Sequence, residues 1–166
     1  MLKKMILVCM MIIPMGLSAQ KFGHINSAAI IPLMAEYTTA QSELEALEKQ
    51  YGEEIKRMQD ELTKKTEELE AQKATLPANI LANREKELQE LYSRMQQYYQ
   101  EGQQHLQRAS EEKMGALTTK LRAAIKEVGD AGGFVYILDA TSGAPYISEL
   151  LSTDVTEQVK AKLGIK

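Results

Sequence analysis

The sequence predicts an α+β fold in which a small β body, built from strands near the two ends of the chain, carries a long antiparallel α-helical hairpin. Two observations predict it. Apolar residues recur at spacings typical of amphipathic, coiled-coil-like helices over roughly 33–76 and again over 80–128. Short strand-like segments at 22–26 and 134–138 flank that pair. The chain of 166 residues has room for one domain.

The start of the chain has the pattern of a secretion signal. Lys3 and Lys4 form a basic beginning, and Met5–Leu17 is an apolar run too short to span a bilayer comfortably. We expect residues 1–19 to be cleaved off after Ala19, with a retained signal anchor as the alternative. Because Cys9 lies inside this segment, the mature chain would have no disulfide and no thiol chemistry.

Charge and composition limit the partners that we expect. The chain has 20 basic and 23 acidic residues, so loss of Lys3 and Lys4 leaves 18 against 23, a net charge of −5. Such a chain gives no electrostatic basis for binding nucleic acid, and membrane contact is possible but not supported by charge. Two Phe, seven Tyr and no Trp supply few large core residues, which favours oligomerisation.

The first elements follow directly after the predicted signal. Phe22–Asn26 alternates apolar and polar residues and is expected to form a short strand. Asn26 and Ser27 are helix-start residues ahead of a short turn over 28–31, which Pro32 kinks or restarts. From Met34 onward the pattern is helical. The apolar seam of this first helix consists of Tyr37, Leu44, Leu47, Tyr51, Ile55, Met58, Leu62, Leu69 and Leu76.

The connection between the helices is short. Leu76-Pro77 ends the first helix, because the residue before a proline disfavours the α region, and Asn79 is a candidate N-cap for the second. The helices must therefore run antiparallel, each on the order of 65–75 Å long at about 1.5 Å per residue. Gly102 and Gly115 lie inside the second helix. One interpretation is close backbone packing or simple tolerance of glycine, and the other is a flexible point in the arm. We favour the first.

The C-terminal part is predicted to return to the body. Gly129–Gly133 ends the second helix and lacks the residues that a phosphate-binding loop needs. Phe134–Leu138 is predicted as a buried strand, and Pro145–Ile147 can form a second short strand after a turn. Thr153 or Asp154 can cap a last helix. The apolar face of that helix consists of Val155, Val159 and Leu163.

The sequence offers no catalytic or metal-binding set. His24 and His105 lie in different elements with no cysteine beside them, so we expect no metal site. The carboxylates lie on helix surfaces among Lys and Arg, as is typical of solvated faces. Ser110 and Ser142 have no supporting His or Asp. We therefore predict no enzyme, no catalytic residue and no cofactor.

Tyrosines and methionines gather along the middle of the predicted hairpin. Tyr92, Tyr98 and Tyr99 cannot all lie on one narrow seam, so some of them must point away from the helix–helix contact. One interpretation is ordinary coiled-coil packing together with surface tyrosines. The other is an adaptable binding surface on the inner side of the arms, since Met and Tyr make permissive contacts with varied apolar partners. The candidate binding residues are Tyr51, Met58, Tyr92, Met95, Tyr98 and Tyr99.

The ends of the chain resemble the Skp/OmpH family of periplasmic chaperones. Phe22–Ser27 is similar to the opening strand and turn of that family. Phe134–Ala140, Ala144–Tyr146 and Asp154–Lys160 are similar to its closing strand, hairpin and C-terminal helix. The resemblance covers essentially the whole mature chain. The similarity at the two ends is specific to this family, whereas helical arms alone would match many coiled coils.

The resemblance implies a homotrimer whose strands assemble one β body, with three helical hairpins around a cavity. That cavity holds unfolded outer-membrane proteins, without ATP, in the periplasm. On this basis residues 20–166 form a single chaperone domain, with the body at 20–36 and 129–166 and the arms at 37–128. The six candidate residues would face the unfolded protein. The residues expected to build the trimer body are Phe22, Ile25, Val135, Ile137, Tyr146 and Val159. Ile137→Asp should then destroy trimers and holding activity together.

The charge of the arms departs from the pattern of the family, whose best-known members are strongly basic with positive arm tips. Here residues 55–95 carry eight basic residues (56, 57, 64, 65, 73, 84, 86, 94) and eight acidic ones (60, 61, 67, 68, 70, 85, 87, 90). A lipopolysaccharide site therefore does not carry over, and capture should depend mainly on apolar contact. The alternative function is a structural coiled-coil adaptor of the cell envelope that binds one folded partner.

Overall fold

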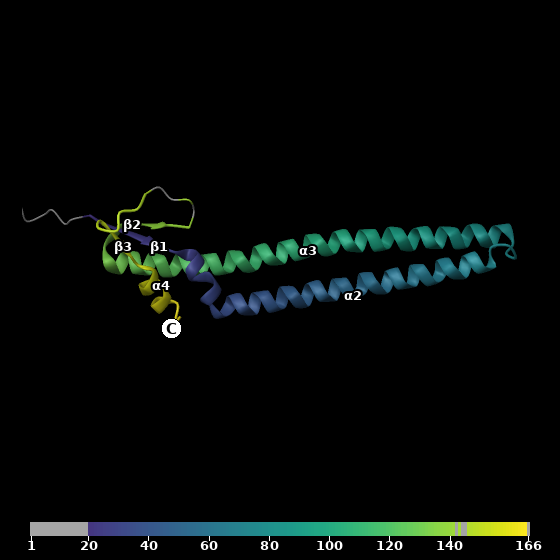
Figure 1. Ribbon diagram of the computed structural model, residues 1–166, viewed down its shortest axis with the longest axis horizontal. Coiled ribbons are helices and arrows are strands. Elements are labelled where there is room, and N and C mark those ends of the chain that lie inside the picture. Colours follow the sequence, from purple (N-terminus) through teal and green to yellow (C-terminus); the bar gives the residue numbers. More distant parts are fainter. Residues whose placement is uncertain (1–19, 142, 144–145, 166) are drawn as a thin grey trace, which may run out of the picture. The chain divides into compact units, whose positions relative to one another are not determined.

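The computed structural model describes residues 20–141, 143 and 146–165 (Figure 1). The predicted signal at 1–19 lies outside them, as do Ser142, Ala144 and Pro145. The elements are β1 (Lys21–Ile25), the 3-10 turns η1 (Ser27–Ala29) and η2 (Ile31–Leu33), α2 (Ala35–Gln72), α3 (Ala78–Gly132), β2 (Phe134–Asp139), β3 (Ser152–Asp154) and α4 (Thr156–Lys162). Long helices with one small three-stranded sheet confirm the predicted α+β class.

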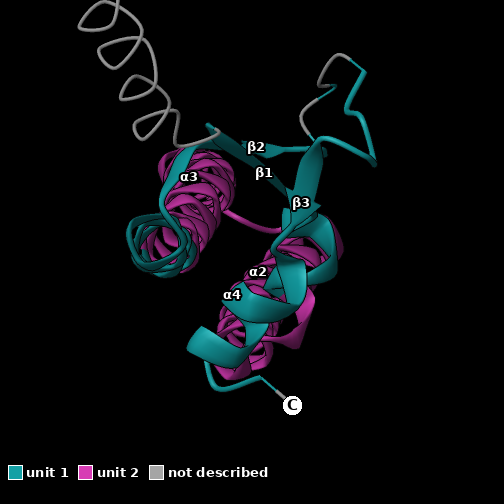
Figure 2. Cartoon of the chain, turned by 90° about the vertical axis from the view of Figure 1, so that its left-hand side faces the viewer, with its two compact units in different colours: residues 1–31, 120–166 teal, residues 32–119 magenta. Residues whose placement is uncertain are grey.

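The chain forms two compact units, shown in different colours in Figure 2. Unit 1 holds the described residues up to Ile31 and from Lys120 onward, and unit 2 spans Pro32–Thr119. The sheet, the end of α3 and α4 belong to unit 1. Unit 2 contains α2 and most of α3.

Unit 2 is an antiparallel helical hairpin. Glu43 of α2 forms an ion pair with Lys113 of α3, and further along α2 the Tyr51 hydroxyl lies 2.8 Å from Nδ1 of His105. A residue further along α2 therefore contacts a residue that comes earlier in α3. The two helices run antiparallel, as predicted (Figure 1). Eight of the nine predicted seam residues lie in α2 and are buried or half-buried, with Met58 and Leu69 the most enclosed. The ninth, Leu76, is half-buried in the turn, because α2 ends at Gln72 and not at Leu76 as predicted. Burial of this stripe is the main force that holds two such helices together.

The helix ends differ from those expected. At about 1.5 Å per residue, the 38 residues of α2 span roughly 57 Å and the 55 residues of α3 roughly 83 Å, so the predicted 65–75 Å is wrong for both. The two 3-10 turns delay the start of α2. The segment Gly129–Gly133 ends α3 as predicted, because the helix continues to Gly132 and stops where Gly133 takes a positive φ of 65°. Asn79 is not an N-cap, because the Pro77 carbonyl already accepts a hydrogen bond from the Leu81 amide.

The two glycines inside α3 meet different surroundings. A Cβ atom at Gly102 would lie 2.8 Å from the ring of Tyr51, whereas one at Gly115 would meet nothing within 4 Å. Gly102 therefore lets the Tyr51 ring lie against the backbone of α3, which is the close packing that we favoured. Gly115 has no such neighbour, which agrees with simple tolerance.

We expect Gly102→Ala to destabilise the hairpin and Gly115→Ala to stabilise it. Alanine gains about 1 kcal/mol over glycine inside a helix at either position. At residue 102 that gain is outweighed by displacement of the Tyr51 ring, since overpacking costs about 1–3 kcal/mol. Urea unfolding followed by circular dichroism measures both variants. Equal stabilisation by both would mean that the Tyr51 contact does not constrain α3.

Unit 1 is built around a parallel sheet of order β2-β1-β3. The last turns of α3 pack on one face of it, and α4 adds further apolar side chains. Because β1 near the N-terminus pairs with β2 and β3 near the C-terminus, segments from both ends of the chain hold this unit together. The buried core consists of Ile25, Ile30, Leu121, Ala124, Val128, Val155 and Val159.

Strand β2 is not the fully buried strand that its composition predicted. Its register against β1 shifts so that Lys21 pairs with Phe134 but Phe22 pairs with Tyr136, which leaves Val135 as an extra residue. After such a bulge, Phe134 and Ile137 both pack against the core, although they are three residues apart. The side chains left outside in β2 are Val135, Tyr136 and Leu138, which are 57%, 49% and 41% exposed.

The third strand lies further along the chain than predicted. Tyr146 and Ile147 form no strand, and β3 is Ser152–Asp154 instead. Three polar residues carry no apolar signal of a strand, and they extend only because they pair with Phe22, Gly23 and His24.

Two aspartates bind the backbone at the ends of these strands. Asp139 Oδ1 accepts hydrogen bonds from the amide and hydroxyl of Thr141 and from the amide of Ser27. Asp154 Oδ1 accepts from the Thr156 amide at 2.8 Å, so it caps the start of α4 although the helix boundary is at Val155. Partial burial by itself raises the pKa of Asp139, but the hydrogen bonds together outweigh it and lower that pKa. The bond from Thr156 is the main cause that lowers the pKa of Asp154.

These shifts predict that unit 1 loses stability in acid. Both pKa values lie below the ordinary value of 3.8, so the unfolded chain binds more protons than the folded one in that range. The stabilisation is therefore complete above the unfolded pKa and is lost as the pH falls through the folded values. The urea midpoint should be level above about pH 5 and fall below about pH 4. Replacing Asp139 and Asp154 by Asn should flatten this dependence, and an unchanged slope would contradict the assignment.

Candidate functional site

The six candidate binding residues fall into two groups. Met58 is buried, and Tyr51, Met95 and Tyr98 are half-buried, all in the contact between α2 and α3. Tyr92 and Tyr99 remain 51% and 47% exposed. The expectation that the tyrosines of α3 cannot all lie on one seam is thus confirmed, since Tyr98 packs inward while Tyr92 and Tyr99 point away.

Tyr51 is the centre of the inward group. Its ring lies 5.3 Å from that of Tyr98 and makes an edge contact with His105, whose Nδ1 is 2.8 Å from the Tyr51 hydroxyl. Burial is the first cause that raises the pKa of the Tyr98 phenol, and the nearby Glu54 carboxylate and Tyr51 add to it. The Tyr98 phenol is therefore neutral in ordinary buffers. Both tyrosines act here as packing groups with polar ends.

Tyr92 and Tyr99 form the outward group. They are seven residues apart in α3, so both lie on the same side of the helix. About half of each side chain lies in solvent, so these rings are available for contact with another molecule, to which a tyrosine offers a large ring and a polar end. We call this pair the outer tyrosines.

Charges in the half of the hairpin nearest its turn are paired locally. Arg57 contacts Glu54 at 2.6 Å and Glu61 at 3.8 Å. Further pairs lie within single helices and join Lys64 to Glu68, Lys73 to Glu70, Arg84 to Glu87, and Lys86 to Glu90. Each such exposed pair contributes little stability, but together they leave no basic patch along this stretch.

The six predicted body residues are divided between core and surface. Ile25 and Val159 lie in the buried core, and Ile137 packs against it. Phe22 is half-buried, with its ring 4.8 Å from that of Tyr136. Val135 is mainly exposed and Tyr146 is 90% exposed.

One face of the sheet carries apolar side chains that the described residues leave largely exposed. Phe22 is paired with Tyr136 and His24 with Leu138, so these four side chains share the face opposite α3. We call it the open sheet face. Tyr136 and Leu138 were not among the predicted site residues, and neither were Leu150 and Leu151, which are 96% and 78% exposed. The apolar pair at 150–151 between polar residues was a signal that could have identified the loop.

Among the described residues, no group of three or more His, Cys, Asp or Glu side chains could hold a metal ion. No helix among the described residues is both long enough and apolar enough to cross a membrane.

Comparison with known proteins gives the family. The family model described as outer membrane protein (OmpH-like) matches residues 21–163, and the chain therefore belongs to this OmpH-like family. The resemblance predicted from the two ends of the chain is thus confirmed. Membership supports a chaperone role rather than an enzymatic one.

Individual relatives add detail. Chaperone protein Skp of Escherichia coli (strain K12) is 27% identical over 150 residues, which cover 86% of this chain and 88% of Skp. Skp of Shigella flexneri matches to the same extent. A crystal structure of a candidate outer membrane chaperone (OmpH-like) from Caulobacter crescentus CB15 has a TM-score of 0.74 at 19% identity, and the match covers 89% of this chain and 86% of that one. This likeness shows that the fold is shared.

Proposed function

We propose that this protein is an ATP-independent holdase chaperone that binds unfolded outer-membrane proteins in the periplasm. The observation that carries the proposal is the match to Skp chaperones over 86% of the chain, which includes both the sheet and the helical hairpin. The pattern of a secretion signal at 1–19 supports the location. Such an unfolded outer-membrane protein is the client of the chaperone.

The proposed working form is a homotrimer assembled through unit 1. All pairings in its sheet are parallel, and parallel sheets are found almost only where both faces are covered. Here α3 covers one face, while Tyr136 and Leu138 on the open sheet face remain 49% and 41% exposed. The strands β2 and β3 are also edges that can accept further strands. Two more copies of the chain would cover these surfaces.

Client capture is proposed to occur along the hairpins. The outer tyrosines supply aromatic contact area, and the locally paired charges leave no net field that would select charged segments. Tyr51, Met58, Met95 and Tyr98 take part in the packing of each hairpin, so they would offer a client only the exposed part of their side chains unless the hairpin rearranged. Many weak contacts inside one enclosure would add up to useful affinity.

The test is the light-scattering mass of the mature protein, alone and mixed with an outer-membrane β-barrel protein diluted from urea. A trimer that keeps the client soluble in a defined complex is the expected result. A chain that lets the client aggregate, but binds one folded envelope protein at a single interface, would instead favour the adaptor function.

A further inference from the structure

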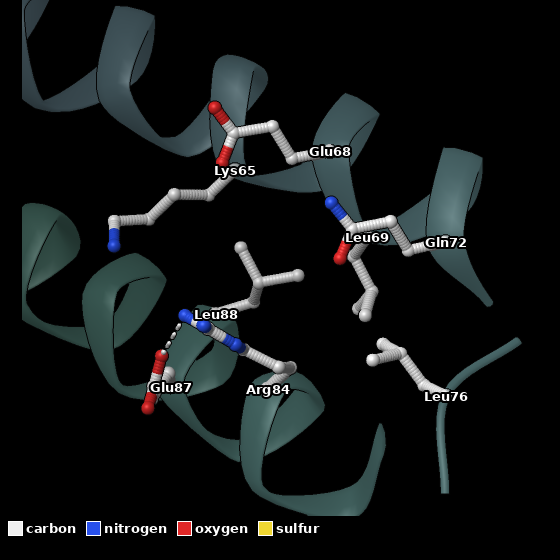
Figure 3. Close-up of a pocket in the computed structure, with 8 residues that line it drawn as sticks. All are labelled: Lys65, Glu68, Leu69, Gln72, Leu76, Arg84, Glu87 and Leu88. Atoms are coloured by element: carbon white, nitrogen blue, oxygen red, sulfur yellow. Dashed lines mark hydrogen bonds and ion pairs between the residues drawn. The ribbon is translucent and has the colours of Figure 1, made fainter. Parts of the chain in front are cut away.

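A small cavity lies between α2 and α3 beside the turn that joins them (Figure 3). Its volume is about 80 Å³, and it lies entirely within unit 2. Three leucines form its apolar part, and charged or amide side chains surround them. We call it the turn-end cavity. Its lining residues are Lys65, Glu68, Leu69, Gln72, Leu76, Arg84, Glu87 and Leu88.

The apolar part fits one small branched side chain. Figure 3 shows the side chains of Leu69, Leu76 and Leu88 directed into the same space from α2, the turn and α3. Leu69 is buried and the other two are half-buried, so a group that enters meets apolar carbon. A cavity of about 150 Å³ holds the six carbons of benzene, so about 80 Å³ holds three or four carbons. That is the size of the branched end of Val, Leu or Ile.

The polar rim selects against charged ligands. Lys65 and Arg84 are opposed by Glu68 and Glu87, and Arg84 Nη1 lies 3.3 Å from Glu87 Oε2. A phosphate or a carboxylate would meet these acidic groups, and a cation would meet the basic ones. A peptide backbone suits such a rim, because its N–H groups can donate to the carboxylates while its carbonyls accept from Lys65, Arg84 or the Gln72 amide.

We propose that the turn-end cavity binds one branched aliphatic side chain of an unfolded client, with the rim contacting the peptide groups on either side. This inference rests on the proposed function. The membrane-spanning strands of β-barrel proteins carry an apolar residue at every second position, so such a client presents many side chains of this kind along neutral segments. The site recognises this local pattern and needs no folded partner.

The experiment follows the leucine methyl signals of the mature protein by NMR. The probes are a short, neutral, blocked peptide with a single central leucine and the same peptide with aspartate in its place. The leucine peptide should shift the methyl signals of Leu69, Leu76 and Leu88, and the aspartate peptide should not. Shifts spread equally over the leucines of the hairpin, or no shift at all, would overturn the proposal.

Two variants test the site with a matched control. Leu88→Phe fills the cavity and should weaken binding of the leucine peptide about tenfold, the loss expected when one aliphatic side chain is no longer buried. Leu44→Phe makes the same change at a half-buried position near the other end of α2 and should leave binding unchanged. If Leu88→Phe perturbs the helices, Gln72→Trp covers the rim from the exposed end of α2 and should give the same loss.

The two levels of the proposal can fail separately. If the wild-type protein holds the β-barrel client but Leu88→Phe and Gln72→Trp bind the leucine peptide as well as wild type, the cavity assignment is wrong and the holdase function stands. If the wild-type protein does not hold the client, the proposed function fails. In that case methyl shifts with the peptide would show only that the cavity accepts a side chain. The inference that the turn-end cavity binds a client would then be wrong as well.

Discussion

Replacing Ile137 by aspartate should unfold unit 1, whereas replacing its neighbour Leu138 by aspartate should leave unit 1 folded and abolish assembly. The two residues are adjacent in β2 but lie on opposite faces of the sheet. Ile137 packs against the core, with its side chain 3.0 Å from where a Cβ at Gly23 would lie. A carboxylate there would pack against the apolar core, and burying it costs several kcal/mol of a total stability of about 5–15 kcal/mol.

Leu138 has a different environment in a single chain. It is 41% exposed, so an aspartate at this position stays in water, and a surface change of this kind alters stability by about 0.5 kcal/mol. If two further copies cover the open sheet face, the same carboxylate becomes buried and unpaired in the assembly, which strongly opposes association. Loss of assembly without loss of folding is the signature that separates this variant from Ile137→Asp.

Light scattering and urea unfolding distinguish the two outcomes. We expect Leu138→Asp to show the mass of one chain with helix content like that of wild type, and Ile137→Asp to lose cooperative unfolding of unit 1. Leu138→Val is the matched control and should keep both mass and stability. A trimer that persists in Leu138→Asp would show that the open sheet face is not the assembly surface.

The parts of the fold that the sequence predicts are those set by local spacing. The seam of α2 follows from residues three and four apart, which lie on one side of a helix wherever that helix packs. The turn at Pro77 and the strand β2 also depend on neighbours in the chain. These features were therefore predicted, although their boundaries shifted by a few residues.

The features that were missed depend on contacts between distant residues. The bulge at Val135 arises where β2 meets β1, more than a hundred residues earlier, and it changes which side chains of β2 are exposed. Strand β3 has no apolar signal and exists only through its pairing with β1. The same holds for the candidate site, because the rotation of α3 decides that Tyr92 and Tyr99 are exposed while Tyr98 packs on Tyr51.

Replacing both outer tyrosines by serine should weaken client binding while leaving the protein folded and assembled. Tyr92 and Tyr99 are about half exposed and lie on one side of α3, so their removal leaves no cavity in the hairpin. An aromatic contact contributes about 0.5–1.5 kcal/mol, so the loss of two should weaken holding by roughly 5-fold to 150-fold. The measurement is the concentration of chaperone that halves aggregation of a urea-diluted β-barrel protein.

The matched control keeps the rings and removes only the hydroxyls. Tyr92→Phe with Tyr99→Phe should hold the client as well as wild type, because the contact depends on aromatic area. If the serine variant holds the client as well as the phenylalanine variant, the outer tyrosines do not contact it. The inward group around Tyr51 and Tyr98 would then be the remaining candidate, and its rings become fully accessible when α2 separates from α3. Such separation would make client binding depend on hairpin stability, so Gly102→Ala and Gly115→Ala, expected to shift that stability in opposite directions, should then change holding in opposite directions as well.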